Sequence, residues 1–309
     1  MLYKRAGLLG GALLSIAMLA SACGSSSGSD GATSPSGEPS ASGDVSVVAS
    51  TNVYGDIVRQ IAGDKVTITS IISDPSADPH SYEANVRTQL ELSKAEVVVE
   101  NGGGYDDFVD TMLKSANSDA KVLNAVEISG KAAGGGELNE HVWYDLPSVG
   151  KLADQLASAL SEAAPGDSAT FTANAATFKQ KLQDMERTAA EIKSAHTGAG
   201  VAITEPVPLY LLDACGLVNK TPGEFSEAIE EGTDVPAGVL QETLDLFAGK
   251  QVELLAYNEQ TAGPETEKVL QAARDNQVGV VPVTETLPAG KDYVTWMSGN
   301  LAAVKSALG

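Results

Sequence analysis

One long amphipathic stretch in the middle of the chain constrains its fold more than any other feature. Between Asp167 and His196 the apolar positions recur in alternating steps of four and three residues, at Phe171, Ala175, Phe178, Leu182, Met185, Ala189 and Ile192. This spacing predicts one continuous helix with a single buried face. Such a helix would be roughly 45 Å long. We interpret it as a strut between two lobes rather than a coiled coil, which needs more flanking charge pairs.

Strand-like and helix-like segments alternate on both sides of this stretch. The expected strands before it are Val45–Ser50, Val66–Ile72, Val97–Glu100 and Val122–Leu123, and those after it are Val201–Thr204, Val252–Asn258 and Val278–Val283. Alternation at this spacing is typical of parallel sheets covered by helices. The sequence therefore predicts an α/β fold with two lobes, each a mostly parallel sheet flanked by helices, joined by one long backbone helix. The expected boundaries are 44–166 for the first lobe, 167–197 for the linking helix and 198–309 for the second lobe.

The N-terminus has the pattern of an export signal. Lys4 and Arg5 precede an apolar run, and small residues lead to Cys23. We expect a signal peptide over 1–22, followed by a lipidated Cys23 and a flexible Gly/Ser/Pro tether over 23–43. An ordinary cleavage site that happens to precede a cysteine is the alternative. The only other cysteine, Cys215, lies in an apolar segment and is expected to be a buried free thiol.

The charge of the chain excludes one class of partner. The formal net charge is −21 at pH 7. Because no basic patch is available to neutralise phosphates, we expect no nucleic acid to bind. An acidic surface does suit a protein that attracts cations.

Two of the three histidines occupy loops of the first lobe. His80 lies in SDPSADPHSYE after the second expected strand, and His141 lies in NEHVWYD. Ligands bind beyond the carboxyl ends of parallel strands, and imidazole is the commonest metal ligand in proteins. Each histidine alone could be only solvated or packed, but two at equivalent ends of a sheet favour a shared site. His196 ends the long helix and is expected at the surface. The glycines of NGGGYDDF are interpreted as a tight strand-to-helix turn, since the P-loop pattern is missing.

Two acids occupy matching positions in the second lobe. Glu205 and Glu285 each follow the end of an expected strand and are flanked by threonine. Together with His80 and His141 they would form a four-ligand cleft. Two neutral imidazoles and two carboxylates suit manganese, iron or zinc.

These four positions, the lipoprotein-like start and the long helix together resemble the metal-binding solute-binding lipoproteins of bacterial ABC importers. The resemblance covers about 44–309. DPHSYE matches the family's first ligand motif at His80, and NEHVWYD is similar to its second at His141, with Glu140 in place of a proline. Glu205 corresponds to the third ligand and Glu285 to the fourth, although Glu140 remains an alternative for the fourth.

The resemblance implies a function and a location. The protein would capture one divalent transition metal, manganese, zinc or iron(II), in the interlobe cleft and deliver it to a membrane permease after a small closure. The segment 129–140 lacks the His-rich loop of zinc-specific members, which favours manganese or iron. The protein would be extracytoplasmic, lipid-anchored to the cell membrane through Cys23, and monomeric.

Two other functions stay open on the residues alone. The acids and histidines could bind a small organic solute by hydrogen bonds. A secreted metal-dependent hydrolase is also conceivable, because two histidines and a glutamate can activate water. The absence of HExxH and a fourth ligand that would close the site both argue against an enzyme. Nothing in these residues favours a surface adhesin.

Overall fold

The computed structural model describes residues 45–77, 79–83, 85–133 and 138–309. The expected signal peptide over 1–22, Cys23 and the tether up to residue 43 lie outside the described residues. Of the helices within the described ranges, none combines the length and the apolar character that crossing a membrane requires.

The first half of the chain forms a parallel sheet with the strand order β2-β1-β3-β4. Its strands are β1 (Val45–Thr51), β2 (Val66–Ile72), β3 (Val97–Glu100) and β4 (Lys121–Asn124). Its α-helices are α1 (Asn52–Ala62), α2 (Val86–Lys94), α3 (Phe108–Ala116), α4 (Ala125–Ser129) and α5 (Leu146–Ala163). Single 3₁₀ turns occupy Pro79–Ser81 (η1), Val142–Tyr144 (η2) and Pro165–Asp167 (η3).

The second half repeats this topology with the strand order β6-β5-β7-β8, again all parallel. Its strands are β5 (Gly200–Ile203), β6 (Val218–Asn219), β7 (Leu254–Asn258) and β8 (Gly279–Val283). Its helices are α7 (Leu209–Ala214), α8 (Gly223–Glu230), α9 (Ala237–Ala248), α10 (Pro264–Asp275) and α11 (Tyr293–Leu308). The predicted fold class, two parallel sheets flanked by helices and joined by a long helix, is confirmed.

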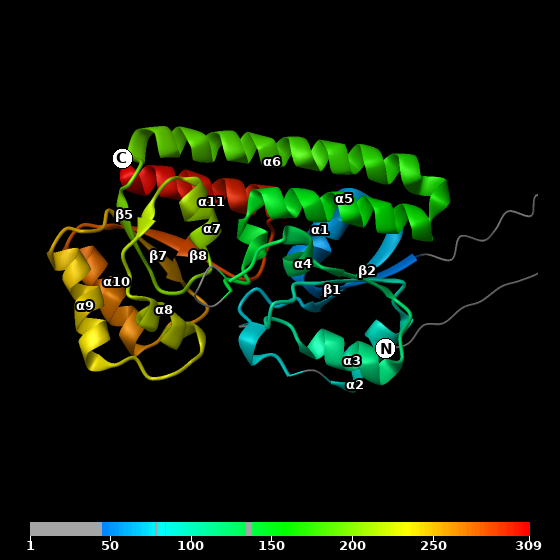
Figure 1. Ribbon diagram of the computed structural model, residues 1–309, viewed down its shortest axis with the longest axis horizontal. Coiled ribbons are helices and arrows are strands. Elements are labelled where there is room, and N and C mark those ends of the chain that lie inside the picture. Colours follow the sequence, from blue (N-terminus) through cyan, green and yellow to red (C-terminus); the bar gives the residue numbers. More distant parts are fainter. Residues whose placement is uncertain (1–44, 78, 84, 134–137) are drawn as a thin grey trace, which may run out of the picture. The chain divides into compact units, whose positions relative to one another are not determined.

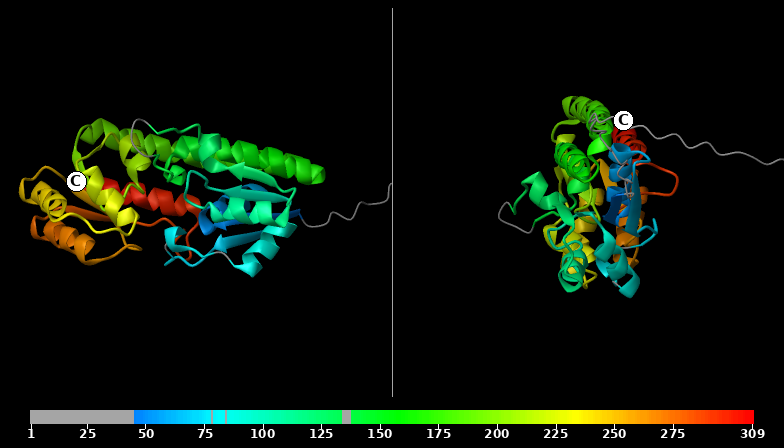
Figure 2. Two further views of the ribbon diagram at one scale, coloured as in Figure 1. Left: turned by 60° about the horizontal axis from the view of Figure 1, so that its bottom comes forward. Right: turned by 90° about the vertical axis from the view of Figure 1, so that its right-hand side faces the viewer.

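Alternate residues of each strand face different helical layers, because side chains alternate across a pleated strand. In the first sheet Val47 packs toward α1 and α5, whereas Val48 packs toward α2 and α3. In the second sheet Ile203 belongs to the core beneath α6 and α11, and Ala202 faces α8, α9 and α10. Figure 2 shows these layers from two further directions. Burial on both faces explains why the strands read as apolar runs.

The helix α6 (Ser168–His196) has 29 residues and starts one residue after the predicted boundary. All seven apolar positions of its predicted stripe are buried, and they are the only buried residues of the helix. The stripe packs on α5, α1 and α11 (Figure 1). These helices therefore share one apolar core with residues of both sheets.

The last helix, α11, adds a second connection between the two halves of the chain. It packs on α6 and β8 and also contacts α1. At its start, the backbone N–H of Tyr293 donates to Asp56 Oδ2 of α1 at 2.8 Å. The sequence analysis assigned this helix to the second lobe alone.

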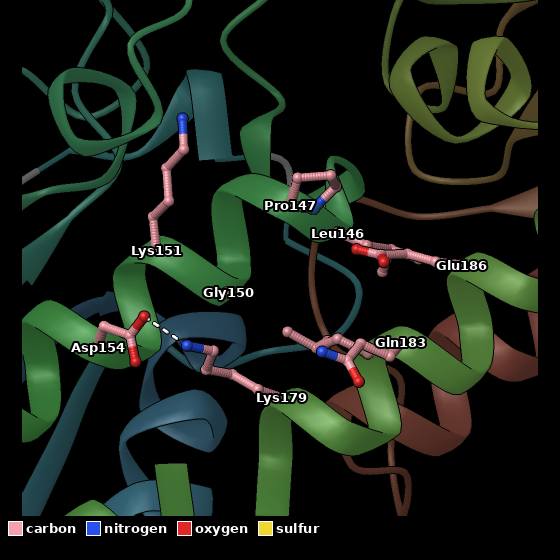
Figure 3. A pocket seen from close by; sticks show the side chains of 9 residues that line it. Leu146, Pro147, Gly150, Lys151, Asp154, Lys179, Gln183 and Glu186 are labelled. Carbon is pink, nitrogen blue, oxygen red and sulfur yellow. Dashed lines mark hydrogen bonds and ion pairs between the residues drawn. The ribbon is translucent and has the colours of Figure 1, made fainter. Parts of the chain in front are cut away.

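The line between α5 and α6 carries a shallow groove of about 230 Å³ (Figure 3). An ion pair crosses it, with Lys179 Nζ 2.6 Å from Asp154 Oδ2. Exposed pairs of this kind contribute little to stability. The apolar stripe beneath the groove is what holds the two helices together.

One acid is buried at the end of a strand in the first sheet. Glu100, at the end of β3, is 5% exposed, and its Oε1 accepts a hydrogen bond from Asn124 Nδ2 at 2.9 Å. Burial raises the pKa of Glu100 to about 7, although the Asn124 hydrogen bond opposes the shift. The folded protein therefore holds a proton on this side chain at pH values where an exposed glutamate has lost it.

Truncation of the stripe should destabilise the whole body. Phe178 is 1% exposed and lies 5.9 Å, centroid to centroid, from the ring of Tyr293. We expect Phe178→Ala to lower the free energy of unfolding by about 3–5 kcal/mol, because it opens a cavity in a shared core. Urea denaturation would measure this. The exposed neighbour Gln183 provides the control, and Gln183→Ala should change stability by less than about 0.5 kcal/mol. Equal effects of the two substitutions would contradict the assigned core face.

Replacement of Glu100 should give a pH-dependent gain in stability. The pKa of Glu100 is higher in the folded than in the unfolded chain, so the folded state loses stability as pH rises from about 4.5 to 7. A glutamine side chain at this position cannot ionise. We expect Glu100→Gln to match the parent at pH 4 and to be about 1–3 kcal/mol more stable at pH 8. Chemical denaturation at both pH values tests this, with the exposed Glu96→Gln as the control. A gain of equal size at pH 4 would refute the assigned cause.

Candidate metal centre

All four predicted ligands lie near the carboxyl ends of the strands. His80 is in η1 after β2, and His141 immediately precedes η2. Glu205 follows β5 by two residues, and Glu285 follows β8 by two residues. Loops at these ends converge in parallel sheets, which is why residues far apart in the sequence can meet.

The structure brings His80, His141 and Glu285 together. The Nε2 atom of His80 lies 3.4 Å from Glu285 Oε2, and the Nε2 atom of His141 lies 3.9 Å from the same oxygen. One potential ligand atom from each residue lies within 4.8 Å of the other two. His141 is fully buried and Glu285 is 1% exposed, whereas the His80 side chain is 25% exposed. The three residues form the inner triad.

The spacing within the inner triad suits an ion better than direct hydrogen bonds. Distances of 3.4–3.9 Å exceed the usual hydrogen-bond range. Ligand atoms bound tetrahedrally at about 2.1 Å from a metal would be about 3.4 Å apart. Among the described residues, His141 Nε2 and Glu285 Oε2 are buried without a hydrogen-bond partner. Buried polar atoms normally have partners, so the inner triad has the donor set and the unmet polar atoms of a cation site.

The electrostatics of the inner triad are those of a buried carboxylate between two bases. Burial acts to raise the pKa of Glu285, but the nearby imidazoles of His141 and His80 lower it to about 2. Burial acts to lower the pKa of His80, but Glu285 outweighs that effect and raises it to about 9. The Glu285 side chain is thus held ionised, and a protonated His80 imidazole balances its charge.

The orientation of His141 is set by its neighbour. His141 Nδ1 lies 2.8 Å from Asn139 Oδ1, and this oxygen also accepts from the His141 backbone N–H at 3.1 Å. Fixing Nδ1 in this way leaves Nε2 to face the inner triad, as partners of metal-ligating histidines commonly do. The rings of Tyr105 and Trp143 pack around the imidazole at centroid distances of 5.9 and 5.0 Å.

The glycine turn over residues 102–104 supports the loop that carries His141. Gly102, Gly103 and Gly104 all have positive φ angles, so the predicted tight strand-to-helix turn is confirmed. Asp106 accepts from the backbone N–H groups of Asn101 and Gly102, each at 2.7 Å. The Asn101 side chain then donates to the backbone carbonyl of Glu140 at 3.0 Å. The turn therefore holds the segment that carries His141.

Glu205 lies beside the inner triad rather than within it. It is 2% exposed, and its Oε2 accepts hydrogen bonds from Thr261 Oγ1 at 2.6 Å and from Asn258 Nδ2. The same Asn258 amide donates to Glu285 Oε1 at 3.1 Å. Burial raises the pKa of Glu205 to about 7, with the Glu285 charge adding to the shift. Asn258 thus joins the two acids that the sequence analysis singled out.

A further acid, Glu230 at the end of α8, approaches the centre. Its Oε1 lies 3.5 Å from His141 Nε2 and is buried without a hydrogen-bond partner among the described residues. Glu230 also groups with His80 and Glu140, again with one potential ligand atom of each within 4.8 Å of the others. The sequence analysis missed Glu230, which is one of several glutamates in EFSEAIEEG. The third histidine, His196, belongs to neither group.

Hydrogen bonds tie the ligand loops of the two halves together. The Gln260 side chain donates to the Ala77 carbonyl at 2.7 Å and accepts from the backbone N–H of Glu285 at 2.5 Å. On the other side of the site, the Asn52 amide donates to the Leu287 carbonyl at 3.0 Å and accepts from its N–H at 2.8 Å. The loop before His80 and the loop with Glu285 are therefore held in register.

A family model described as zinc-uptake complex component A, periplasmic (ZnuA), matches residues 47–307. The manganese-binding lipoprotein MntA of Halalkalibacterium halodurans is 24% identical over 253 residues, which are 75% of this chain and 80% of that protein. The manganese ABC transporter substrate-binding lipoprotein scaA of Streptococcus gordonii is 29% identical over 164 residues, or 49% of this chain and 52% of that protein. Among solved structures, the periplasmic zinc binding protein TroA from Treponema pallidum has a TM-score of 0.73 at 19% identity, covering 86% of this chain and 100% of that one.

Replacement of Asn258 should destabilise the protein, because the Asn258 amide donates hydrogen bonds to both acids. Asn258→Asp would place a third carboxylate against Glu205 and Glu285 and would remove the amide that donates to both. We expect the metal-free protein to lose about 3–5 kcal/mol of stability at pH 8, measured by denaturant titration. Asn276→Asp at the exposed end of α10 is the matched control and should be near neutral. A stable Asn258→Asp variant would contradict the proposed contact.

Proposed function

Because this chain belongs to the family of the periplasmic zinc-uptake complex component A, we propose that it binds one divalent transition metal at His80, His141 and Glu285 and delivers it to an importer permease. Members of this family are substrate-binding proteins of ABC importers and not enzymes. The hydrolase and organic-solute alternatives are therefore not favoured. The metal is cargo, so the site has to release it as well as hold it.

The observation that carries the proposal is the pair of unpartnered buried atoms at the centre. His141 Nε2 and Glu285 Oε2 face each other without a hydrogen bond, and both atoms are shielded from solvent. A bound cation would neutralise the ionised carboxylate and accept the lone pairs of both imidazoles. Nitrogen and oxygen donors of this kind suit manganese, zinc and iron(II). Relatives named for manganese and for zinc support the same class of cargo.

For the fourth ligand we propose Glu205. Thr261 and Asn258 donate to its Oε2, and Oε1 is the oxygen through which it would reach the metal. A metal ion beside Glu205 would also offset the free-energy cost of burying its ionised carboxylate. His80, His141, Glu205 and Glu285 would then give two nitrogen and two oxygen ligands.

We further propose that the protein works outside the cytoplasm, anchored through lipid on Cys23 and tethered by residues 24–43. The relatives named as lipoproteins support this arrangement. The permease partner follows from membership of an importer family. We also propose that the body acts as a monomer, with lobes over 44–166 and 198–309 linked by 167–197.

A metal titration of the soluble body from residue 44 onward tests the ligand assignment. We expect one equivalent of manganese(II) or zinc(II) to bind, and unfolding to require about 2.7 kcal/mol more at a free metal concentration about 100 times the Kd. His141→Ala should abolish this shift, whereas His196→Ala should leave it unchanged. Calorimetry and thermal melts measure both. Retained stoichiometric binding in His141→Ala would reject the site.

The same titration discriminates between the acids. Glu285→Gln should weaken binding the most, because it removes the only carboxylate of the inner triad. Glu205→Gln should weaken binding by about 10–100-fold if it supplies a ligand oxygen. An unchanged Kd for Glu205→Gln would remove it from the ligand set while leaving the other three residues in place.

The anchor has its own test in cells. Cys23→Ala should move the protein from the membrane fraction to the soluble extracytoplasmic fraction, because the cysteine sulfur carries the lipid. Cys215→Ala is the control and should stay in the membrane fraction, since Cys215 is a buried thiol in the body. Fractionation and mass spectrometry of the mature N-terminus measure the outcome. An unchanged membrane location for Cys23→Ala would refute the proposed anchor.

A further inference from the structure

A cavity reaches the candidate centre at His80. It has a volume of about 440 Å³ and is lined by His80, Glu140 and Glu230, together with residues of α8 and the 206–209 segment. Neither His141 nor Glu285 lines it. An ion that comes through this cavity therefore meets His80, Glu140 and Glu230 before it meets the fully buried ligands.

These first-met residues form a second possible ligand group. One ligand atom from each of His80, Glu140 and Glu230 lies within 4.8 Å of the other two. We call this group the outer triad. It offers one nitrogen and two carboxylates, a set that binds manganese or zinc. It shares His80 with the inner triad, so an ion in either position is bound to His80.

Glu230 connects the two positions. Its side chain is 16% exposed and belongs to the outer triad, yet its Oε1 is 3.5 Å from the fully buried His141 Nε2. That nitrogen has no hydrogen-bond partner among the described residues and faces the Glu230 carboxylate. A buried, unpartnered imidazole nitrogen directed at a carboxylate is a place where a cation would be stabilised. The His141 nitrogen lies 3.5 Å from Glu230 of the outer triad and 3.9 Å from Glu285 of the inner triad.

We propose that His80, Glu140 and Glu230 form a transient outer metal position, from which the ion passes to His141 and Glu285 while it stays bound to His80. The ion exchanges the Glu140 and Glu230 oxygens for His141 and Glu285, one ligand at a time. This stepwise exchange avoids an intermediate in which the ion has lost its water and has too few protein ligands. The inference rests on the proposed function, because it needs the inner position as the destination.

The negative charge of the cavity is a competing explanation for fast metal association. It has to be distinguished from binding at the outer triad. Among its described lining residues are four glutamates, Glu140, Glu227, Glu230 and Glu231, and no Lys or Arg. A negative cavity alone would attract cations and speed association. Glu227 and Glu231 line the same cavity, are exposed and lie outside the outer triad. They are matched controls, since each substitution to glutamine removes the same charge.

Stopped-flow kinetics of the metal-free protein with manganese(II) or zinc(II) chloride provide the test. Trp143, whose ring lies 5.0 Å from His141, serves as the fluorescent reporter. We expect Glu140→Gln to slow association and dissociation by the same factor, at least fivefold, with the equilibrium Kd changed less than twofold. Glu227→Gln and Glu231→Gln should change either rate by less than twofold at about 0.15 M salt, where exposed charges are largely screened. Equal slowing by the controls, or an unchanged rate in Glu140→Gln, would overturn the outer position.

A second measurement looks for the outer ion directly. In Glu285→Gln the inner position is weakened, and the anomalous signal of zinc in soaked crystals should lie between His80, Glu140 and Glu230. It should disappear in the Glu140→Gln, Glu285→Gln double variant. A signal elsewhere would reject the proposal. If the parent protein binds no metal at all, the proposed function fails; if it binds metal and only these results fail, the outer position alone is wrong.

Discussion

Burial of the Glu285 carboxylate is the constraint on which the centre depends. An ionised acid that is 1% exposed is costly unless a positive charge compensates it. A proton on the His80 imidazole supplies that charge, and a divalent ion could supply it instead. Metal and protons therefore compete for the same place. Hydrogen bonds donated by Asn258 and accepted by Asn139 and Gln260 fix where each group points.

The scaffold could be predicted from the sequence because its signals are long and periodic. The seven apolar positions of α6 define the buried face, and segments rich in β-branched residues such as Val66–Ile72 coincide with observed strands. The missed elements are short. α4 has five residues and β6 has two, too few for a period to be recognised. The contact of α11 with α1 was also missed, since an amphipathic pattern states that a face is buried but not against which partner.

The centre was harder to predict than the scaffold. His80, His141 and Glu285 stood out because histidines are rare here and because strand ends attract ligands, and the structure does bring these three together. Glu205 stood out for the same reason but lies beside them, bound to Asn258 and Thr261. Glu230 was not separable from Glu227 and Glu231, its neighbours in one acidic segment. Its position depends on how α8 packs against the first half of the chain, which no local pattern encodes.

The pair of hydrogen bonds between Asn52 and Leu287 has a consequence for how the centre is assembled during synthesis of the protein. These residues are 235 positions apart, and contacts between such distant residues form late because the intervening chain must first be ordered. His80 and His141 both precede α6 in the chain, whereas Glu285 follows the last strand of the second sheet, β8. Glu285 is synthesised after every other residue assigned to the centre. The inner triad therefore depends on contacts across most of the described chain, and a nascent chain that ends before Glu285 lacks the carboxylate of the inner triad.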